Sequence, residues 1–160
     1  MATNFALRSV GRAAVVILIA AVLAACAQKQ EQLNGQAVPG SAQDFVVNVG
    51  DRVYFAVDQT DLSSTAQATL DKQAQWLQRY NKYTITIEGH ADERGTREYN
   101  LALGARRASS VRAFLASRGV APNRMRTISY GKERPVAVCD NESCWSQNRR
   151  AVTVLDNAGS

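Results

Sequence analysis

The apolar and polar positions of residues 45–160 alternate between two periods along the chain, which predicts alternating strands and helices. Over residues 84–88 Thr and Ile alternate, and this period of two predicts a strand with one buried face. Similar patterns predict a strand before this one and two after it, over residues 51–55, 125–130 and 151–155.

Two longer segments have the period of a helix. The first, residues 64–80, opens on Ser64 and Gln67, which match a capping box. Its apolar residues fall on one face: Leu70, Ala74 and Leu77. The second is predicted from Thr96 to Arg118, followed by Gly119 and Pro122 as stop signals. The resulting β-α-β-α-β-β order predicts an α+β sandwich, with the helices packed on one face of a mixed four-stranded sheet.

The first 25 residues have the pattern of an export signal. Arg8 and Arg12 precede an apolar run over residues 13–25, which is too short to span a bilayer. The run ends in small residues directly before Cys26, and this ending resembles the bacterial lipobox, in which the Cys thiol receives lipid. The alternative is an ordinary signal peptide with an incidental Cys.

The chain is therefore expected to have three parts. Residues 1–25 are the lipoprotein signal peptide, and residues 26–44 carry the lipidated Cys26 and a flexible tether rich in Gln, Ala, Gly and Ser. Residues 45–160 form the globular domain. Without Arg8 and Arg12, 17 basic and 14 acidic residues remain, so the net charge falls from +5 to +3. No basic block is interleaved with aromatic residues, which argues against binding of nucleic acid.

Three cysteines are an odd number for an exported protein. The count is explained if Cys26 carries lipid and Cys139 pairs with Cys144 across four polar residues. So short a loop should contribute about 2 kcal/mol on the chain-entropy model. The alternative is a zinc site, which needs two further ligands, and His90 is the only histidine in the chain.

Two opposite charges are the candidate binding residues. Asp92 lies in the loop after a predicted strand, and Arg107 lies on a helix face that is otherwise apolar. They could form a structural salt bridge, or they could stay partly open and bind a zwitterion, with the ammonium on Asp92 and the carboxylate on Arg107. Gly104, one turn before Arg107, favours the second explanation, because a helix interior avoids Gly at a cost of about 1 kcal/mol unless something approaches closely. Gly89 and Gly95 on either side of Asp92 leave the loop free to adopt unusual dihedrals.

Six motifs occur in an order that resembles one known family. They are VYFxxD at 53–58, GHADERGT at 89–96, YN at 99–100, RA at 107–108, SYGKExP at 129–135 and NRR at 148–150. Together they resemble the OmpA-like C-terminal domain family, in its lipoprotein branch, over roughly residues 45–156.

The resemblance implies binding of diaminopimelate, the residue of the peptidoglycan stem peptide that carries an amine and a carboxylate on one terminal carbon. Asp92 would accept the ammonium and Arg107 would hold the carboxylate. The remaining positions would support them: Asn100 would orient the loop or touch the peptide, Phe55 and Asp58 would form part of the wall, and Arg149 would lie at the rim. A Lys peptide lacks the carboxylate, so we expect a preference for diaminopimelate.

The resemblance also implies partners and a location. The chain is expected to be lipid-anchored in the outer membrane with its domain in the periplasm, to bind diaminopimelate-type peptidoglycan, and to act with TolB and other Tol proteins during envelope constriction. Ala27, in place of Asp after Cys26, favours the outer membrane. A rival reading is a wall anchor for another envelope machine, such as a motor or secretion apparatus.

No cofactor and no enzymatic activity are expected. The sequence has no HExxH motif and no Ser or Cys nucleophile beside a base. A peptidoglycan hydrolase would need two separated carboxylates that face the scissile bond, whereas Asp92 and Glu93 are adjacent in a loop, where neighbouring side chains usually point in different directions. His90 is interpreted as a packed residue.

Overall fold

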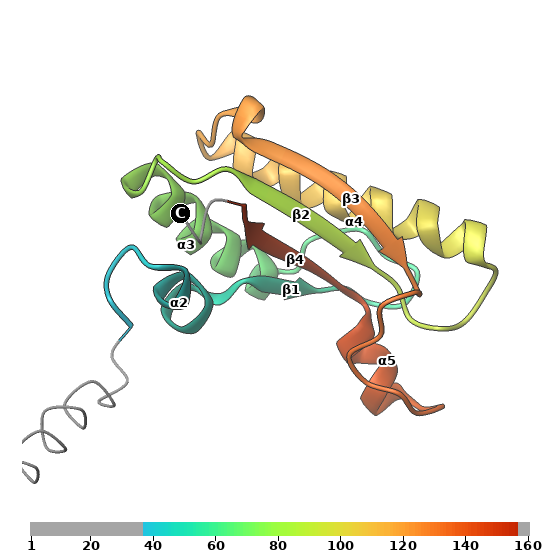
Figure 1. Cartoon of the computed structure of the whole chain (residues 1–160). Coiled ribbons are helices and arrows are strands. Elements are labelled where there is room, and N and C mark those ends of the chain that lie inside the picture. The colour runs from blue at the N-terminus through green and yellow to red at the C-terminus, as the bar shows by residue number, and fades with distance from the viewer. Residues whose placement is uncertain (1–36, 157–160) are drawn as a thin grey trace, which may run out of the picture. The chain divides into compact units, whose positions relative to one another are not determined.

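The computed structural model describes residues 37–156, which fold around one four-stranded sheet. Its strands are β1 (Arg52–Tyr54), β2 (Ile85–His90), β3 (Met125–Gly131) and β4 (Arg150–Leu155), in the spatial order β1-β4-β2-β3. β4 pairs antiparallel with both β1 and β2, while β2 and β3 are parallel. The sheet is mixed, and the α+β class predicted from the pattern is confirmed (Figure 1).

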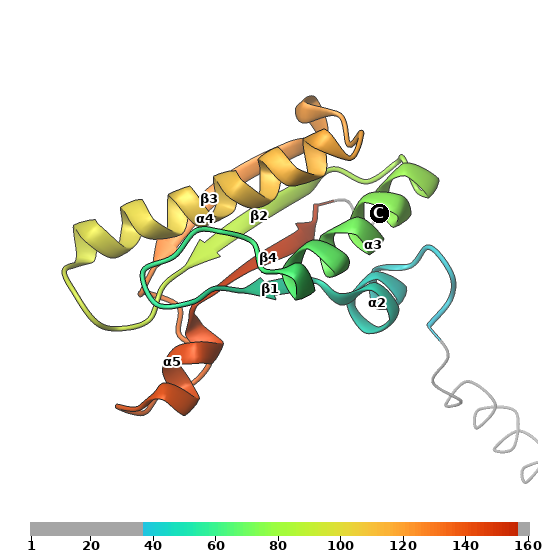
Figure 2. The ribbon, with the colours of Figure 1, turned by 180° about the vertical axis from the view of Figure 1, so that it is seen from behind.

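Two long helices cover the same face of this sheet. They are α3 (Ser64–Arg79) and α4 (Arg97–Ser117), which lie in front of the strands in Figure 2 and behind them in Figure 1. The predicted apolar stripe of α3 is buried in the core, with Leu70 and Leu77 fully buried and Ala74 only 2% exposed. The burial of this stripe against the strands is what fixes α3 on the sheet.

The ends of the helices follow the predicted signals with one correction. Ser63, not Ser64, is the N-cap of α3, and its hydroxyl accepts a hydrogen bond from the amide of Ala66. Gln67 therefore does not complete a capping box and instead donates to the carbonyl of Leu62. α4 is capped by Thr96 as its sequence indicates. It ends at Ser117, and Gly119, two residues later, has the left-handed φ of 89° that favours glycine.

The compact unit begins earlier than the expected boundary at residue 45. Its contacts start at Ala37 and include a short helix, α2 (Ala42–Asp44), and the π-helical turn η2 (Phe45–Gly50). Asp44 accepts from the indole nitrogen of Trp76 at 2.8 Å, and the hydroxyl of Tyr83 donates to the carbonyl of Gly40. These bonds hold residues that composition alone assigned to the tether, because composition carries no information on such tertiary partners.

Two further short elements were not predicted. A 3-10 turn, η3 (Pro122–Arg124), leads into β3, and α5 (Glu142–Asn148) stands between β3 and β4. β2 also continues past its predicted end at residue 88 to His90, with a shift in register against β3 between Gly89 and His90. This irregularity lies directly before the loop that carries Asp92.

The predicted signal peptide, Cys26 and most of the expected tether lie outside residues 37–156. Within that range no helix is both long and apolar enough to cross a membrane.

Candidate functional site

The two charges chosen from the sequence line one cavity of about 310 Å³. The cavity lies where the loop after β1, the loop after β2 and the first turns of α4 meet. Its lining residues are Val57, Asp58, Asp92, Arg94, Gly95, Tyr99, Asn100, Leu103 and Arg107.

Asp92 follows the end of β2 and holds a fully paired carboxylate. Arg94 contacts it through Nε, at 3.2 Å from Oδ1, and through Nη2, at 2.6 Å from Oδ2. The backbone amide of Arg94 adds a bond to Oδ1, and Nη1 of Arg149 lies 3.3 Å from Oδ2. Burial acts to raise the pKa of Asp92, but the hydrogen bonds from Arg94 and Arg149 outweigh it, so the pKa is lowered and the group is ionised.

Arg107 has no exposed surface and is held by backbone oxygens. Its guanidinium donates to the carbonyls of Gln59, His90 and Ala56, at 2.9, 2.9 and 3.1 Å. Burial lowers its pKa to about 10, although attraction from Asp92 opposes this. At neutral pH Arg107 is therefore a buried cation that ties the loop after β1 to the end of β2.

Asp92 and Arg107 are not joined by an ion pair. Within residues 37–156 the ion pairs of Asp92 are with Arg94 and Arg149. The structural salt bridge between Asp92 and Arg107, considered from the sequence, is therefore not formed. The expectation that the pair stays partly open is also wrong, because Asp92 is 7% exposed and Arg107 is fully buried. The two groups share a cavity, but each has its own partners.

Asn100 and Asp58 lie where the resemblance placed them, at the cavity. Asn100 is 1% exposed, and its amide donates to the carbonyl of Arg94 at 2.8 Å, which holds the Asp92 loop. Asp58 accepts from the hydroxyl of Tyr99 and has the left-handed φ of 56°. That bond joins the loop after β1 to α4 across the cavity.

Phe55 and Arg149 were expected at the wall and the rim, and the structure places both behind the cavity. Phe55 is 4% exposed, and its ring centroid lies 5.1 Å from Cζ of Arg107. Arg149 is 5% exposed and bonds Asp92, Glu142 and the carbonyl of Phe55. Both side chains are buried, and they contact the two charged residues of the cavity, Phe55 against Arg107 and Arg149 against Asp92.

The glycine at position 104 is explained by close packing of α4 on β2 and not by a nearby ligand. A Cβ on Gly104 would lie 2.8 Å from the carbonyl oxygen of Gly89 and would also clash with the hydroxyl of Ser129. A Cβ on Gly89 would in turn overlap the backbone of Gly104. What approaches this part of α4 closely is the backbone of β2, so the inference of a nearby ligand from Gly104 was wrong.

Arg94, Tyr99 and Val57 line the cavity but were not chosen from the sequence. Arg94 and Tyr99 lie within the quoted motifs, at 89–96 and 99–100, so their neighbourhood carried a signal. Their contacts with Asp92 and Asp58 depend on how two loops fold back on each other, which spacing along the chain does not give.

The segment between β3 and β4, residues 132–149, forms a disulfide-closed arm that includes α5 and contacts the Asp92 loop through Trp145. Cys139 and Cys144, the two cysteines paired in the sequence analysis, form a disulfide with a Cα–Cα distance of 5.6 Å. No group of three or more His, Cys, Asp or Glu side chains in residues 37–156 could hold a metal ion, so the zinc alternative has no ligand set there. The side chain of Asn148 bonds the backbone of Val136 and Ala137 and fixes the base of the arm.

His90 is packed under the sheet end and is not placed for catalysis. It is 2% exposed, its ring lies 5.6 Å from that of Tyr130, and neither ring nitrogen has a hydrogen-bond partner in the part of the chain that the structure describes. Burial, with the charges of Arg150 and Arg134, lowers its pKa to about 4.

Comparison with known proteins shows the family and the fold of the chain. The model of the OmpA family matches residues 54–150. The peptidoglycan-associated lipoprotein of Rhizobium meliloti is 64% identical over 155 residues, which cover 91% of this chain and 88% of the relative. Such relatives are named as peptidoglycan-associated lipoproteins and not as enzymes.

Solved structures give the same result. The crystal structure of the peptidoglycan-associated lipoprotein from Burkholderia pseudomallei is 46% identical, with a TM-score of 0.64 over 66% of this chain and 89% of that one. The C-terminal domain of Helicobacter pylori MotB has a TM-score of 0.63 at 22% identity, over 68% of this chain and 86% of that one, which shows a shared fold alone.

Proposed function

Because the chain belongs to the OmpA family, and within it to the peptidoglycan-associated lipoproteins, we propose that it binds the diaminopimelate stem peptide of peptidoglycan without forming a covalent bond. The single observation that carries this proposal is the shared cavity. Asp92 and Arg107 line the same 310 Å³ space but do not neutralise each other. A ligand that brings both an ammonium and a carboxylate can pair with both if it replaces an arginine on Asp92 and reaches the buried guanidinium of Arg107.

The chemistry of each partner follows from its bonds. The carboxylate of Asp92 is ionised and accepts an ammonium, for which it offers short charge-assisted hydrogen bonds. Arg107 uses three of its N–H groups on carbonyls, and a guanidinium has five, so two donors remain. Because Arg107 has no exposed surface, a ligand carboxylate reaches these donors only when the cavity opens. Asn100 and Asp58 fix the two loops between which the ligand lies.

The second part of the proposal concerns the location of the protein in the cell. We place the chain as an outer-membrane lipoprotein, anchored through acyl chains on Cys26, with its domain in the periplasm. Two or more chains hold a protein stably at a membrane, whereas one holds it only marginally. The relatives are named as lipoproteins, which supports the anchor, although Cys26 lies outside the described residues.

We further assign the chain to the Tol–Pal system of the envelope, with TolB as its partner and envelope integrity and constriction during division as its role. This assignment rests on the family resemblance. A pull-down with the immobilised full chain tests it, and failure to retain TolB would remove the partnership while leaving wall binding in place.

Sedimentation with diaminopimelate-type sacculi tests wall binding. The full chain in detergent should pellet with the sacculi, and Asp92→Asn should lose at least about tenfold in affinity, because a charged hydrogen bond contributes about 1.5–3 kcal/mol. Asp71→Asn is the matched control, since Asp71 pairs with Arg118 on the surface of α3, away from the cavity. Equal pelleting of folded Asp92→Asn and wild type would contradict the proposed site.

A further inference from the structure

Neither Asp92 nor Arg107 is open to a ligand in the described structure. All four hydrogen bonds that Asp92 accepts come from Arg94 and Arg149, and a carboxylate offers about four lone-pair positions. Arg107 has no exposed surface. An ammonium therefore cannot add to Asp92, and it has to replace one of the two arginines.

Of these two arginines, Arg94 is the one that can leave. Its side chain is 40% exposed, and within residues 37–156 it donates two hydrogen bonds, both to Asp92. The side chain of Arg149 is 6% exposed and also bonds Glu142 and the carbonyl of Phe55. Moving Arg149 would break a buried network, whereas moving Arg94 breaks one half-exposed ion pair, in which the guanidinium already touches solvent.

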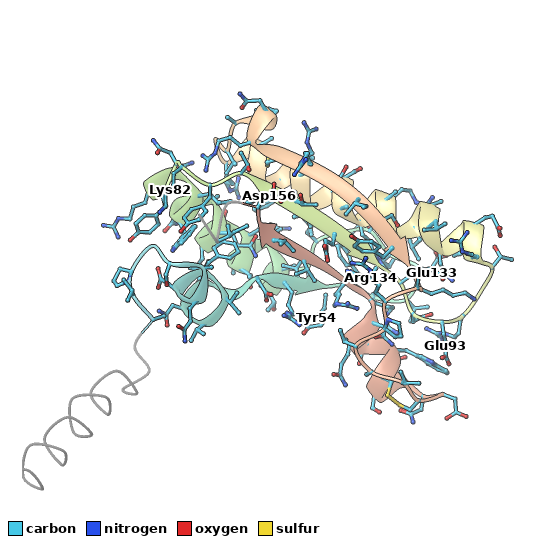
Figure 3. The ribbon with its side chains drawn as sticks, in the orientation of Figure 1. Tyr54, Lys82, Glu93, Glu133, Arg134 and Asp156 are labelled. Atoms are coloured by element: carbon cyan, nitrogen blue, oxygen red, sulfur yellow. A yellow bond between two sulfur atoms is a disulfide. The ribbon has the colours of Figure 1, made fainter. Side chains whose placement is uncertain are left out.

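The disulfide-closed arm gives Arg94 a second contact, which it makes while it also bonds Asp92. Cζ of Arg94 lies 4.2 Å from the ring centroid of Trp145, a distance at which a cation is attracted by the ring face. The indole nitrogen of Trp145 donates to Glu93 at 3.0 Å, which fixes the ring. Glu93 is labelled in Figure 3, on the loop that faces α5. Negative charge from Glu142 and Glu93 also acts on Arg94.

We infer that Arg94 is a movable cover of the binding site, which occupies the ammonium position on Asp92 in the unliganded protein and is exchanged for the ammonium of the ligand. Trp145 retains the displaced guanidinium, so the exchange does not require Arg94 to be fully solvated. This inference rests on the proposed function and goes beyond it. It makes Arg94 a competitor of the ligand and Trp145 a positioning residue for Arg94.

A double-mutant cycle tests the cover, with calorimetric titration of the full chain in detergent by the stem tripeptide that ends in diaminopimelate. Arg94→Ala should bind about 3- to 10-fold more tightly, because the competitor is gone. Trp145→Leu should bind a few-fold more weakly than wild type, but Trp145→Leu in the Arg94→Ala background should have no effect. A coupling of this kind is not expected if Trp145 only stabilises the fold.

Two matched variants test whether the effects are specific to Arg94 and to the aromatic ring of Trp145. Arg97→Ala removes a nearby exposed arginine that pairs with Glu133, outside the cavity, and should leave the affinity unchanged. Trp145→Phe keeps an aromatic face for Arg94 but loses the bond to Glu93, and it should fall between wild type and Trp145→Leu. Thermal melts confirm that each variant is folded.

The outcomes distinguish the cover from the proposed function. Weaker binding by folded Arg94→Ala would overturn the cover and leave wall binding in place, because Arg94 would then be a ligand contact. An equal loss on Trp145→Leu in both backgrounds would also overturn it. If wild type and all variants fail to bind the tripeptide, the proposed function and the cover both fail.

Discussion

At the scale of single residues, the site contains two charged side chains, Asp92 and Arg107, that are buried although charged groups are more stable in water. Arg107 is fully buried, and this burial lowers its pKa to about 10. Three backbone carbonyls compensate for it. Replacing Arg107 by Ala would leave these carbonyls without donors, so loss of binding in that variant could reflect unfolding. Asp92→Asn is the sharper substitution because it keeps the shape.

His90 predicts a pH dependence of stability. Its ring is buried with Glu88 at 3.7 Å from Nε2 and the charges of Arg150 and Arg134 acting on it, and its pKa is lowered to about 4. An unfolded His has an ordinary pKa of about 6.5, so the unfolded state binds the proton first as the pH falls. The stability from neutral His90 is therefore complete above pH 6.5 and is lost between about pH 6.5 and 4, on the order of 3 kcal/mol.

Urea unfolding at pH 7, 5.5 and 4.5 measures this effect. Wild type should lose free energy of unfolding through the window, and His90→Phe, which cannot take up a proton, should lose much less. Carboxylates protonate in the unfolded state mainly below about pH 5, so the comparison at pH 5.5 isolates the His. Parallel curves for the two proteins would show that His90 is not the group that titrates.

At the scale of elements, the site is placed by the close crossing of α4 and β2. Gly104 and Gly89 face each other at this crossing, and neither has room for a Cβ. This contact brings the first half of α4, with Asn100 and Arg107, next to the end of β2, where Asp92 follows. The two glycines therefore set the distance between the two charged residues.

Gly104→Ala should destabilise the protein although Ala is the better helix former. Propensity favours Ala by about 1 kcal/mol, but the added Cβ would press on the Gly89 carbonyl and on Ser129, and overpacking costs about 1–3 kcal/mol. We expect a lower melting temperature and weaker binding of the stem peptide, measured on the same sample. Ser109→Ala, on an exposed position of α4, is the control and should not lower the melting temperature. An unchanged melt for Gly104→Ala would contradict the close crossing.

At the scale of the whole molecule, sequence patterns predicted the sheet, both long helices and the two charged residues that share the cavity. Period and cap signals are local, so they can be read from consecutive residues. The partners of Asp92 could not be predicted this way, because Arg149 comes from the far end of the chain and Arg94 reaches back only through the shape of its loop. α5 and the packing of residues 37–44 also depend on tertiary contacts.

The central claim is that the cavity selects a ligand with both charges. The most direct test is calorimetric titration of the full chain with two stem tripeptides that differ only in their last residue, diaminopimelate or Lys. We predict that the Lys peptide binds at least about fivefold more weakly, since Arg107 then lacks a carboxylate partner at a cost of about 1–3 kcal/mol. Asp92→Asn should bind both peptides weakly. Equal affinity of wild type for the two peptides would contradict the account.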